Sequence, residues 1–346
     1  MEVRFYDENL RMRGVMENQT SLIWRRKYFT PGEFEMHTPI TDYNLFLTQR
    51  KNLVWIAGHE EAGVIEDRKI EESGTKNEIT IKGRFLSSYM DRRLIRSTIR
   101  FSGYVEEAMR ELLSRVEAIP LVRLGMSGGF TDTVSFQVTY KNLLTYMEKL
   151  ARSSGLGFRL RPDFAKKVIY FEVYQGVDRS VSQTKSSRVI FSESYDNLNN
   201  TVFRENDQLY KNVAYVGGEG EGSERVYVKV GNGAGLDLRE IFVDARDLRS
   251  EGLTAEEYKA QLEQRGRESL AESVISSSLE CDTGANVNFS YRVDYDLGDV
   301  VTVQKKAWGI REDLRITEIC EVYENETMTV VPTLGSPLPE TIDWSD

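Results

Sequence analysis

The sequence predicts a mainly β protein with α+β modules. Three observations support this fold class. Short apolar segments separated by turn residues fill most of the chain, which is typical of sandwiches and small barrels. In the middle of the chain the apolar period changes from two to 3.6, which indicates two amphipathic helices. A third and longer helix interrupts the strands of the second half.

Residues 1–97 are expected to form a first β-barrel domain. Their short apolar segments are separated by turn sequences such as DEN, PGE and GHEEAG. In EFEMHTP, the side chains of Phe34, Met36 and Thr38 share one face of a strand, and the alternate residues share the other. Many short strands at this spacing favour a closed or sandwiched sheet.

Residues 98–175 are expected to form an α+β module. The first helix begins after Ser102, the predicted N-cap, and ends before Pro120. A strand, TVSFQVTY, and a second helix follow, and the second helix has Gly155 as its predicted C-cap. LGFRLRPD and KKVIYFEVYQG then form a hairpin. The predicted apolar stripe of the first helix consists of Val105, Ala108, Met109, Leu112, Leu113 and Val116.

The second half of the chain is expected to hold a discontinuous β-barrel domain, made of residues 176–235 plus 282–333. Residues 236–281 form a helical insertion within it. Thr254 and Glu257 have the spacing of a capping box, and Leu253 and Tyr258 that of a hydrophobic staple. The predicted strands after the helix include NVNFSYRVDY. Residues 334–346 have no core pattern and are predicted to be an extended tail.

Composition excludes several classes of protein. The chain has 346 residues and a net charge of −10, which argues against a sequence-specific reader of nucleic acid and against an anionic membrane surface as partner. Cys281 and Cys320 are the two cysteines. They have no zinc spacing, whether they pair is left open, and a reducing compartment is the simplest origin. The N-terminus lacks the features of a signal peptide, and no apolar run is long enough to span a membrane.

The sequence predicts no catalytic, cofactor-binding or metal site. The two histidines, His37 and His59, lie in strand-rich sequence on or beside turns, and HExxH is absent. Adjacent carboxylates are expected on surfaces: Glu106 and Glu107 on the solvent side of a helix, and Glu256 and Glu257 in a first helical turn. The other adjacent pairs are Glu60–Glu61 and Glu71–Glu72.

Glycine-rich and basic segments also match no chemical motif. GGEGEGS at 217–223 lacks the phosphate-loop pattern and is predicted to be a flexible hairpin tip, with contact to a neighbour as the alternative. The basic segments are RMR at 11–13, RRK at 25–27 and DRRLIRSTIR at 91–100. For these, solvated surface, protein–protein contact and nucleic-acid contact are the alternatives, in that order.

DYDLGDVVTV at 294–303 carries three carboxylates, those of Asp294, Asp296 and Asp299. The spacing fails the EF-hand loop at positions 5, 6 and 12. The segment is therefore predicted to be a corner between strands, with Gly298 in the turn and Val301 and Val303 facing the core.

Several segments together resemble the tail-hub family of tailed phages, prophages and phage-like bacteriocins, which includes baseplate hubs and the N-terminal structural parts of siphophage tail-associated proteins. The segments span nearly the whole chain. They are the W-x-x-K-Y-x-x-P-G-E-F-E run at 24–35, GVIEDR at 63–68, TIKGRFLSSYMDRR at 80–93, VIFSESYDNLNN at 189–200, LYKNVAYVGGEGEG at 209–222, EIFVDARDL at 240–248, YDLGDVVTV at 295–303 and RITEICEVYE at 315–324.

The resemblance implies two β-barrel tube domains in a homotrimer, whose six barrels continue the sixfold tail tube and adapt it to a threefold spike or fibre. It implies the tail tube or distal tail protein, the spike or fibre protein and the tape-measure protein as partners. It also implies a place in a virion tail or phage-like particle made in the bacterial cytoplasm, with no cofactor and no enzymatic activity. A tail-associated cell-wall hydrolase or depolymerase, and an oligomeric adaptor outside phages, are the alternatives.

Overall fold

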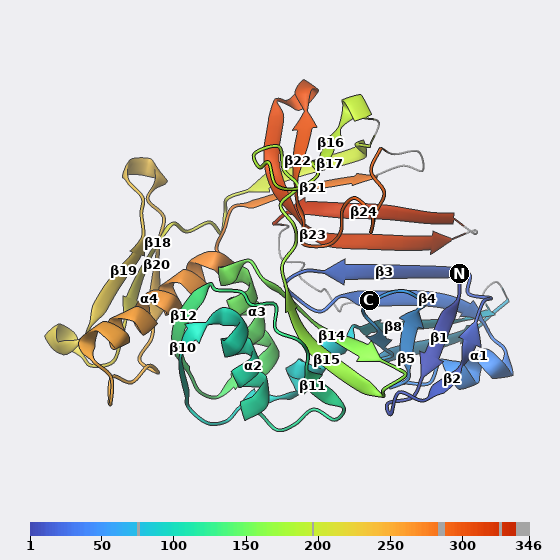
Figure 1. Cartoon of the computed structure of the whole chain (residues 1–346), viewed down its shortest axis with the longest axis horizontal. Helices are drawn as coiled ribbons and strands as arrows, with labels where there is room; N and C mark the ends of the chain where they lie inside the picture. The colour runs from blue at the N-terminus through green and yellow to red at the C-terminus, as the bar shows by residue number, and fades with distance from the viewer. Residues whose placement is uncertain (75–76, 196, 283–287, 325–326, 337–346) are drawn as a thin grey trace. The chain divides into compact units, whose positions relative to one another are not determined.

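The computed structural model describes residues 1–74, 77–195, 197–282, 288–324 and 327–336. The chain is mainly β, with several sheets and four α-helices among these residues, which confirms the predicted fold class (Figure 1). It divides into two compact units. The first contains the described parts of 1–134, 138–176 and 319–330, and the second those of 135–137, 177–318 and 331–336. No helix within the described residues has the length and apolar character to cross a membrane.

Two sheets surround the principal core of the first unit. One has the strand order β2-β1-β5-β6. The other has the order β3-β4-β8-β7 and continues beyond β3 with β23. The elements are β1 (Val3–Tyr6), β2 (Met12–Met16), β3 (Ser21–Lys27), β4 (Glu33–Pro39), α1 (Asp42–Leu47), β5 (Leu53–Ile56), β6 (Gly63–Val64), β7 (Asp67–Glu72), β8 (Asn77–Arg84) and β23 (Ile310–Glu324).

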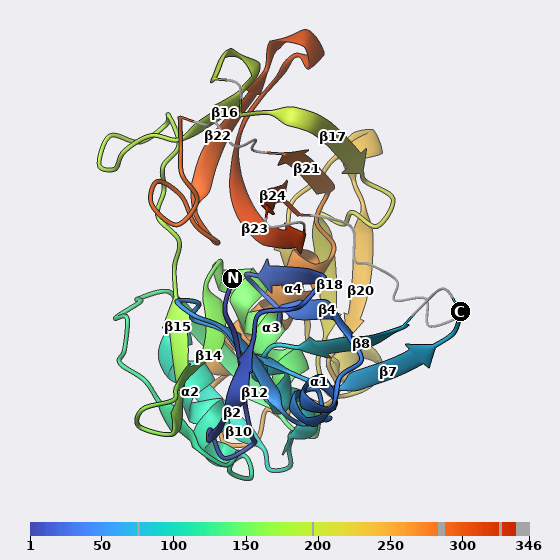
Figure 2. The same ribbon diagram turned by 90° about the vertical axis from the view of Figure 1, so that its right-hand side faces the viewer.

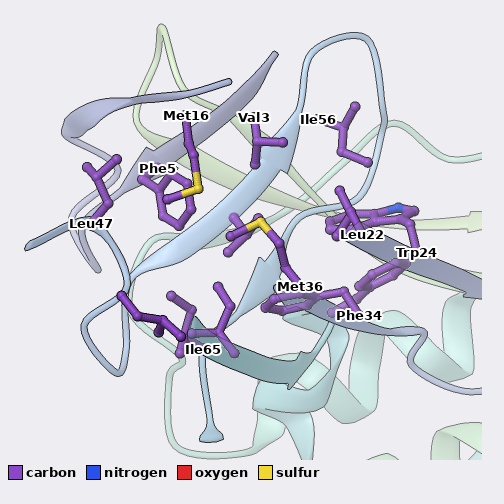
Figure 3. Close-up of a cluster of buried hydrophobic side chains, with 14 residues drawn as sticks. Val3, Phe5, Met16, Leu22, Trp24, Phe34, Met36, Leu47, Ile56 and Ile65 are labelled. Carbon is purple, nitrogen blue, oxygen red and sulfur yellow. The ribbon is translucent and has the colours of Figure 1, made fainter. Parts of the chain in front are cut away.

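The core between these sheets is built from alternating side chains (Figure 3). In β4 every second residue, Phe34, Met36 and Thr38, is buried, as the sequence pattern predicts. The indole of Trp24 in β3 packs against the rings of Phe34 and Phe85, whose centroids lie 5.8 and 4.5 Å away. One apolar layer therefore joins both sheets.

The two sheets meet where β6 lies beside β8. Gly63 and Phe85 form an isolated antiparallel bridge, and the Leu86 amide donates to the Ala62 carbonyl. A Cβ on Gly83 would lie 1.8 Å from the Val64 carbonyl oxygen, so this close approach requires glycine. Closure of the two sheets into a complete barrel stays a prediction.

Helix α1 was not predicted, since the first 97 residues were all assigned to strands and turns. Thr41 is its N-cap and accepts a hydrogen bond from the Asn44 amide. Asn44 is buried and donates to the Thr38 hydroxyl and the Pro39 carbonyl. A helix of six residues is too short for a periodic apolar pattern, so local capping is its main sequence signal.

The rest of the first unit has the predicted helices and hairpin. α3 packs against α2, β14 and β15 form an antiparallel hairpin, and β11 extends it in parallel. Gly155 ends α3 in the left-handed conformation, as predicted. The elements between residues 94 and 174 are β9 (Leu94–Ile95), β10 (Ile99–Tyr104), α2 (Val105–Arg115), β11 (Val122–Leu124), β12 (Thr133–Val138), β13 (Lys141–Asn142), α3 (Leu143–Ser154), β14 (Gly157–Asp163) and β15 (Val168–Tyr174), and the middle of β12 is counted with the second unit.

The predicted cap of α2 is wrong. Tyr104 is the N-cap, without a side-chain hydrogen bond, because Ser102 still belongs to β10. The predicted apolar stripe of α2 is buried apart from Val116, which follows the helix.

The second unit has two groups of strands. In one, β17 (Asn199–Asn206), β21 (Ser276–Asp282) and β24 (Thr327–Gly335) are neighbours, and β22 (Val300–Lys305) pairs with β16 (Ile190–Ser192) and β23 (Figure 2). In the other, β18 (Val213–Gly217) lies between β19 (Tyr227–Gly231) and β20 (Glu240–Asp244). Helix α4 (Ala255–Glu272) packs along this second sheet (Figure 1). The predicted boundaries of the two barrel domains and of the insertion stay predictions.

The start of α4 confirms the predicted capping box. The Thr254 hydroxyl accepts from the Glu257 amide, and the Glu257 carboxylate accepts from the Thr254 amide. Tyr258, predicted for the staple, is buried on the β18–β20 sheet with Leu253 packed beside it.

Two strand assignments after α4 need correction. β21 was not predicted, because its residues were placed in the helical insertion. Conversely, the described part of NVNFSYRVDY forms turns, with only an isolated bridge between Tyr291 and Tyr295. The Asp294 carboxylate accepts a hydrogen bond from the Ser290 amide, and Arg292 has a φ of 66°. These local bonds replace the strand ladder that the alternation had suggested. The predicted tail lies, from residue 337 onward, outside the described residues.

Candidate functional site: a buried ionic cluster

The largest group of buried charges lies in the first unit and centres on Arg26 and Glu61. Arg26 is in β3, and its side chain points into the core. The side chains of its two neighbours, Arg25 and Lys27, lie on the other face of the strand and pair with Glu33. Its Nε lies 3.1 Å from both carboxylate oxygens of Glu61, and its Nη2 lies 2.9 Å from Oε1. Both side chains are almost fully buried. The surface alternatives predicted for segment 25–27 are therefore wrong for Arg26, and the surface position predicted for the Glu60–Glu61 pair is wrong for Glu61.

Glu61 is held in its charged form. Burial by itself would raise its pKa, but the attraction of Arg26 and the hydrogen bonds from that guanidinium outweigh burial and lower the pKa overall. Arg159 and His59 act in the same direction. A carboxyl group with a lowered pKa, and with both oxygens bound to a guanidinium, is poorly suited to act as a general acid.

A second layer of charges extends from this pair to the β14–β15 hairpin. Arg159 of β14 donates to Glu60 and, through Nε at 2.9 Å, to Glu172 of β15. Arg161 donates to the same Glu172 carboxylate at 2.8 Å. Burial tends to raise the pKa of Glu172, but Arg161 and Arg159 lower it overall. The guanidinium of Arg159 also lies 4.9 Å from the ring centroid of Tyr174.

Tyr28, one residue beyond β3, also joins the end of β3 to the β14–β15 hairpin. Its ring is fully buried, and its hydroxyl lies 3.1 Å from the Gly155 carbonyl, 3.3 Å from the Tyr174 carbonyl and 3.3 Å from the Gly176 amide. A Cβ on Gly157 would lie 2.7 Å from the Tyr28 ring, so the ring packs directly on the backbone of β14.

His59 connects the loop before Glu60 to strand β23. Its Nε2 lies 2.7 Å from Oε2 of Glu321, which also accepts from the Tyr323 hydroxyl at 2.5 Å. Glu321 is fully buried and His59 nearly so. The His59 carbonyl accepts from the Trp55 indole, and the Trp24 ring meets the imidazole edge-on. The part of β23 that belongs to the first unit is thus bonded to the same core.

The cluster is suited to holding strands together. Its carboxylates are paired with arginines or histidine, and its groups come from β3, the loop before β6, the β14–β15 hairpin and β23. Among the residues that the structure describes, no group of histidine, cysteine or carboxylate side chains could hold a metal ion. The absence of catalytic and metal residues predicted from the sequence remains a prediction.

The second histidine, His37, lies on the outer face of β4. Its Nε2 is 3.0 Å from Glu35 and its Nδ1 is 3.4 Å from Glu78. Lys82 approaches Glu35 at 3.1 Å from the neighbouring strand. His37 and Glu35 are neighbours on one face of β4, whereas Glu78 and Lys82 reach them from the adjacent strand β8, so only the latter contacts are cross-strand pairs.

Glu106 is buried, which contradicts its predicted place on the solvent side of α2. Its carboxylate accepts hydrogen bonds from the amides of Gly128 and Gly129, both at 2.9 Å, and Phe130 approaches at 3.4 Å. Met126, in the loop held by this carboxylate, is 90% exposed. Glu106 therefore anchors a loop, while its neighbour Glu107 is exposed as predicted.

We expect Glu106→Ala to lower the unfolding free energy by about 1–3 kcal/mol, because the loop amides lose the buried carboxylate that accepts their hydrogen bonds. Glu107→Ala is the matched control and should change it by less than about 0.5 kcal/mol. Thermal denaturation gives the difference, and hydrogen exchange at Gly128 and Gly129 should rise only in Glu106→Ala. Equal effects of the two substitutions would contradict the anchoring role.

The three aspartates of DYDLGD are turn-forming residues. Asp296 accepts from the Leu297 amide, and Asp299, which is buried, accepts from the Val177 amide at 2.7 Å and Arg179 Nε at 2.8 Å. Gly298 has a φ of 92°, and Val301 and Val303 are fully buried. The predicted turn at Gly298 and the core positions of Val301 and Val303 are confirmed, but the turn is not a corner between two strands, because the segment before it is not a strand.

The glycine-rich segment at 217–223 connects β18 to β19, so the predicted hairpin is confirmed. Glu219 in this connection accepts from the Ser250 amide. The question left open for Cys281 and Cys320 concerns a disulfide, and the structure shows none between these two residues.

Comparison with known proteins identifies the family of the chain. The model of one protein family, described as Siphovirus ReqiPepy6 Gp37-like protein, matches residues 2–336. The chain belongs to this siphovirus protein family. Its membership confirms the resemblance to phage tail proteins found in the sequence. A search of curated proteins finds no match.

Solved structures show that this Gp37-like chain shares the fold of phage and prophage tail proteins. A tail protein from Neisseria meningitidis MC58 has a TM-score of 0.61 and 13% identity, over 96% of this chain and 95% of that one. The 43 kDa tail protein of prophage MuSo2 from Shewanella oneidensis has a TM-score of 0.59 and 13% identity, over 97% and 99%. The prophage tail protein gp18 from Listeria monocytogenes EGD-e has a TM-score of 0.58 and 12% identity, over 98% of this chain and 96% of that one. The chain thus belongs to the Gp37-like siphovirus family and has the fold of phage tail proteins.

Proposed function

We propose that the chain is a hub of the tail, a trimeric ring that joins the sixfold tail tube to a threefold spike or fibre. The observation that supports the proposal most is the fold correspondence over 95–99% of three tail proteins together with the family match over residues 2–336. The proposed partners are a further two copies of the chain, the tail tube or distal tail protein, the spike or fibre protein and the tape-measure protein.

The charge of the chain is compatible with this role. A net charge of −10 gives the protein no general attraction for DNA phosphates. A ring with an acidic inner wall would let DNA pass without binding it. In the proposal, the acidic residues therefore line the lumen, and an acidic outer face with a neutral lumen would count against it.

Mass photometry of the purified chain at several concentrations tests the ring. We expect a trimer, or a monomer–trimer equilibrium that moves toward trimer as concentration rises. Particle images should show a ring with threefold symmetry. A monomer at every concentration, both alone and with tail-tube protein, would contradict the hub.

Zymography on bacterial cell walls tests the alternative of a tail-associated hydrolase. The hub proposal expects no clearing. Clearing that is lost when one carboxylate is replaced by its amide would favour the enzyme.

A further inference from the structure

A groove of about 520 Å³ opens on the second unit, between β17 and the turn before β23. Apolar and acidic side chains alternate around it. Its lining residues are Phe203, Glu205, Trp308, Gly309, Ile310 and Glu312, and we call this set the acidic groove. Glu205 and Glu312 come from different strands and bring two carboxylates to one opening.

The aromatic part of the acidic groove accepts a cation. Trp308 is 49% exposed, although tryptophan is normally more buried. The Nζ of Lys305 lies 4.2 Å from the centre of its ring while it also pairs with Glu193 at 3.2 Å. The indole is thus already in a cation–π contact, which is the interaction that arginine forms most readily at interfaces.

The two carboxylates of the acidic groove have no cation of their own. Within the described part of the chain, neither Glu205 nor Glu312 forms an ion pair. Both are exposed on strands whose backbones are fixed by pairing, Glu205 with Ser277 and Glu312 with Val303. Two fixed carboxylates beside an indole and a phenyl ring are complementary to guanidinium groups flanked by an apolar side chain.

Such a surface lies on the first unit, in the segment DRRLIRSTIR. Ile95 and Ile99 are buried and hold the segment, while Arg92, Leu94, Arg96 and Arg100 are exposed, and we call these four residues the basic strip. Leu94 is 51% exposed. Arg96 pairs with Glu117 at 3.3 Å, but the two side chains are 72% and 67% exposed, so this pair contributes little and can be exchanged.

We propose that the acidic groove of one copy receives the basic strip of a second copy. This inference rests on the proposed trimer and names its contact surfaces. A contact between two different patches is heterologous, and repetition of such a contact closes a ring when the rotation allows it. Aromatic residues and arginine, the two enriched classes at interface centres, come together in this contact. Each of the three junctions would then be identical.

Charge reversal tests the contact. The groove variant is Glu205→Lys with Glu312→Lys, and the strip variant is Arg92→Glu with Arg96→Glu. Each should weaken trimer formation by about a hundredfold or more, because like charges then face each other. The chain with all four substitutions restores opposite charges at every junction and should form trimers again. The control, Glu240→Lys with Glu251→Lys, changes the net charge as much as the groove variant does and should remain trimeric.

Mass photometry and sedimentation at matched concentrations give the trimer fraction, and circular dichroism checks that each variant is folded. Rescue in the fourfold variant would support the pairing and would show that neither double variant failed merely by misfolding. If the native chain is trimeric and both double variants stay trimeric, the inference is wrong while the hub stands. That outcome is also expected if the acidic groove binds a basic segment of another protein. If the native chain never forms trimers, both proposals fail.

Discussion

Val301→Asp is expected to leave the protein unfolded or insoluble. Val301 is fully buried in β22, which lies between β16 and β23, and its pairing partner is Leu314 of β23. An aspartate there would place an unpaired charge in an apolar layer and lower the unfolding free energy by about 4 kcal/mol or more. That is a large fraction of the stability of an ordinary domain. The fraction of soluble protein after expression, and denaturation of what remains soluble, measure the effect.

Two matched substitutions separate this effect from a general sensitivity of the turn. Lys306→Asp introduces the same side chain at an exposed position just after the strand and should be tolerated. Asp296→Ala removes a carboxylate that accepts a hydrogen bond from the adjacent Leu297 amide, and the variant should keep the function of the native protein. A soluble Val301→Asp protein with unchanged denaturation would show that β22 is not part of a packed core.

The sequence predicts those parts of the fold in which a local pattern alone decides the structure. The Thr254–Glu257 capping box, the Gly155 helix end and the Gly298 turn each depend on a few neighbouring residues and are present as predicted. Alternation in β4 predicts its buried face for the same reason. It fails in NVNFSYRVDY, where the Asp294 side chain bonds to the backbone four residues before it.

The ionic cluster could not be predicted, because its members are distant in sequence and each one alone is typical of a surface. Arg26 and Glu61 are 35 residues apart, and Glu321 is 262 residues from His59. One local signal was present. Arg159 and Glu172 lie directly opposite each other in the predicted hairpin, so opposite charges at these positions indicate a cross-strand pair. Glu106 gave no such signal, because the loop amides that it binds have no sequence pattern.

Arg26→Met should lower the unfolding free energy by about 3–5 kcal/mol, the cost of leaving one partner of a buried ion pair uncompensated. Arg26 supplies most of the hydrogen bonds that hold Glu61, and methionine fills a similar volume without a charge. Equilibrium denaturation with urea near neutral pH measures the change. Arg25→Met is the matched control, because Arg25 pairs with Glu33 at the surface, and its effect should be under about 1 kcal/mol.

The double variant Arg26→Met with Glu61→Leu distinguishes loss of the pair from loss of packing. Removal of both charges should recover most of the stability, because a buried ion pair contributes little beyond an apolar pair of similar size. The dependence on pH adds a second readout. The folded-state pKa of Glu61 is lowered, so its contribution is complete above the ordinary glutamate pKa of about 4.3 and is lost as pH falls through the lowered pKa. The native chain should therefore lose more stability than the double variant on acidification. Identical acid profiles, or a double variant as unstable as Arg26→Met, would mean that Arg26 acts through its packing and not through its charge.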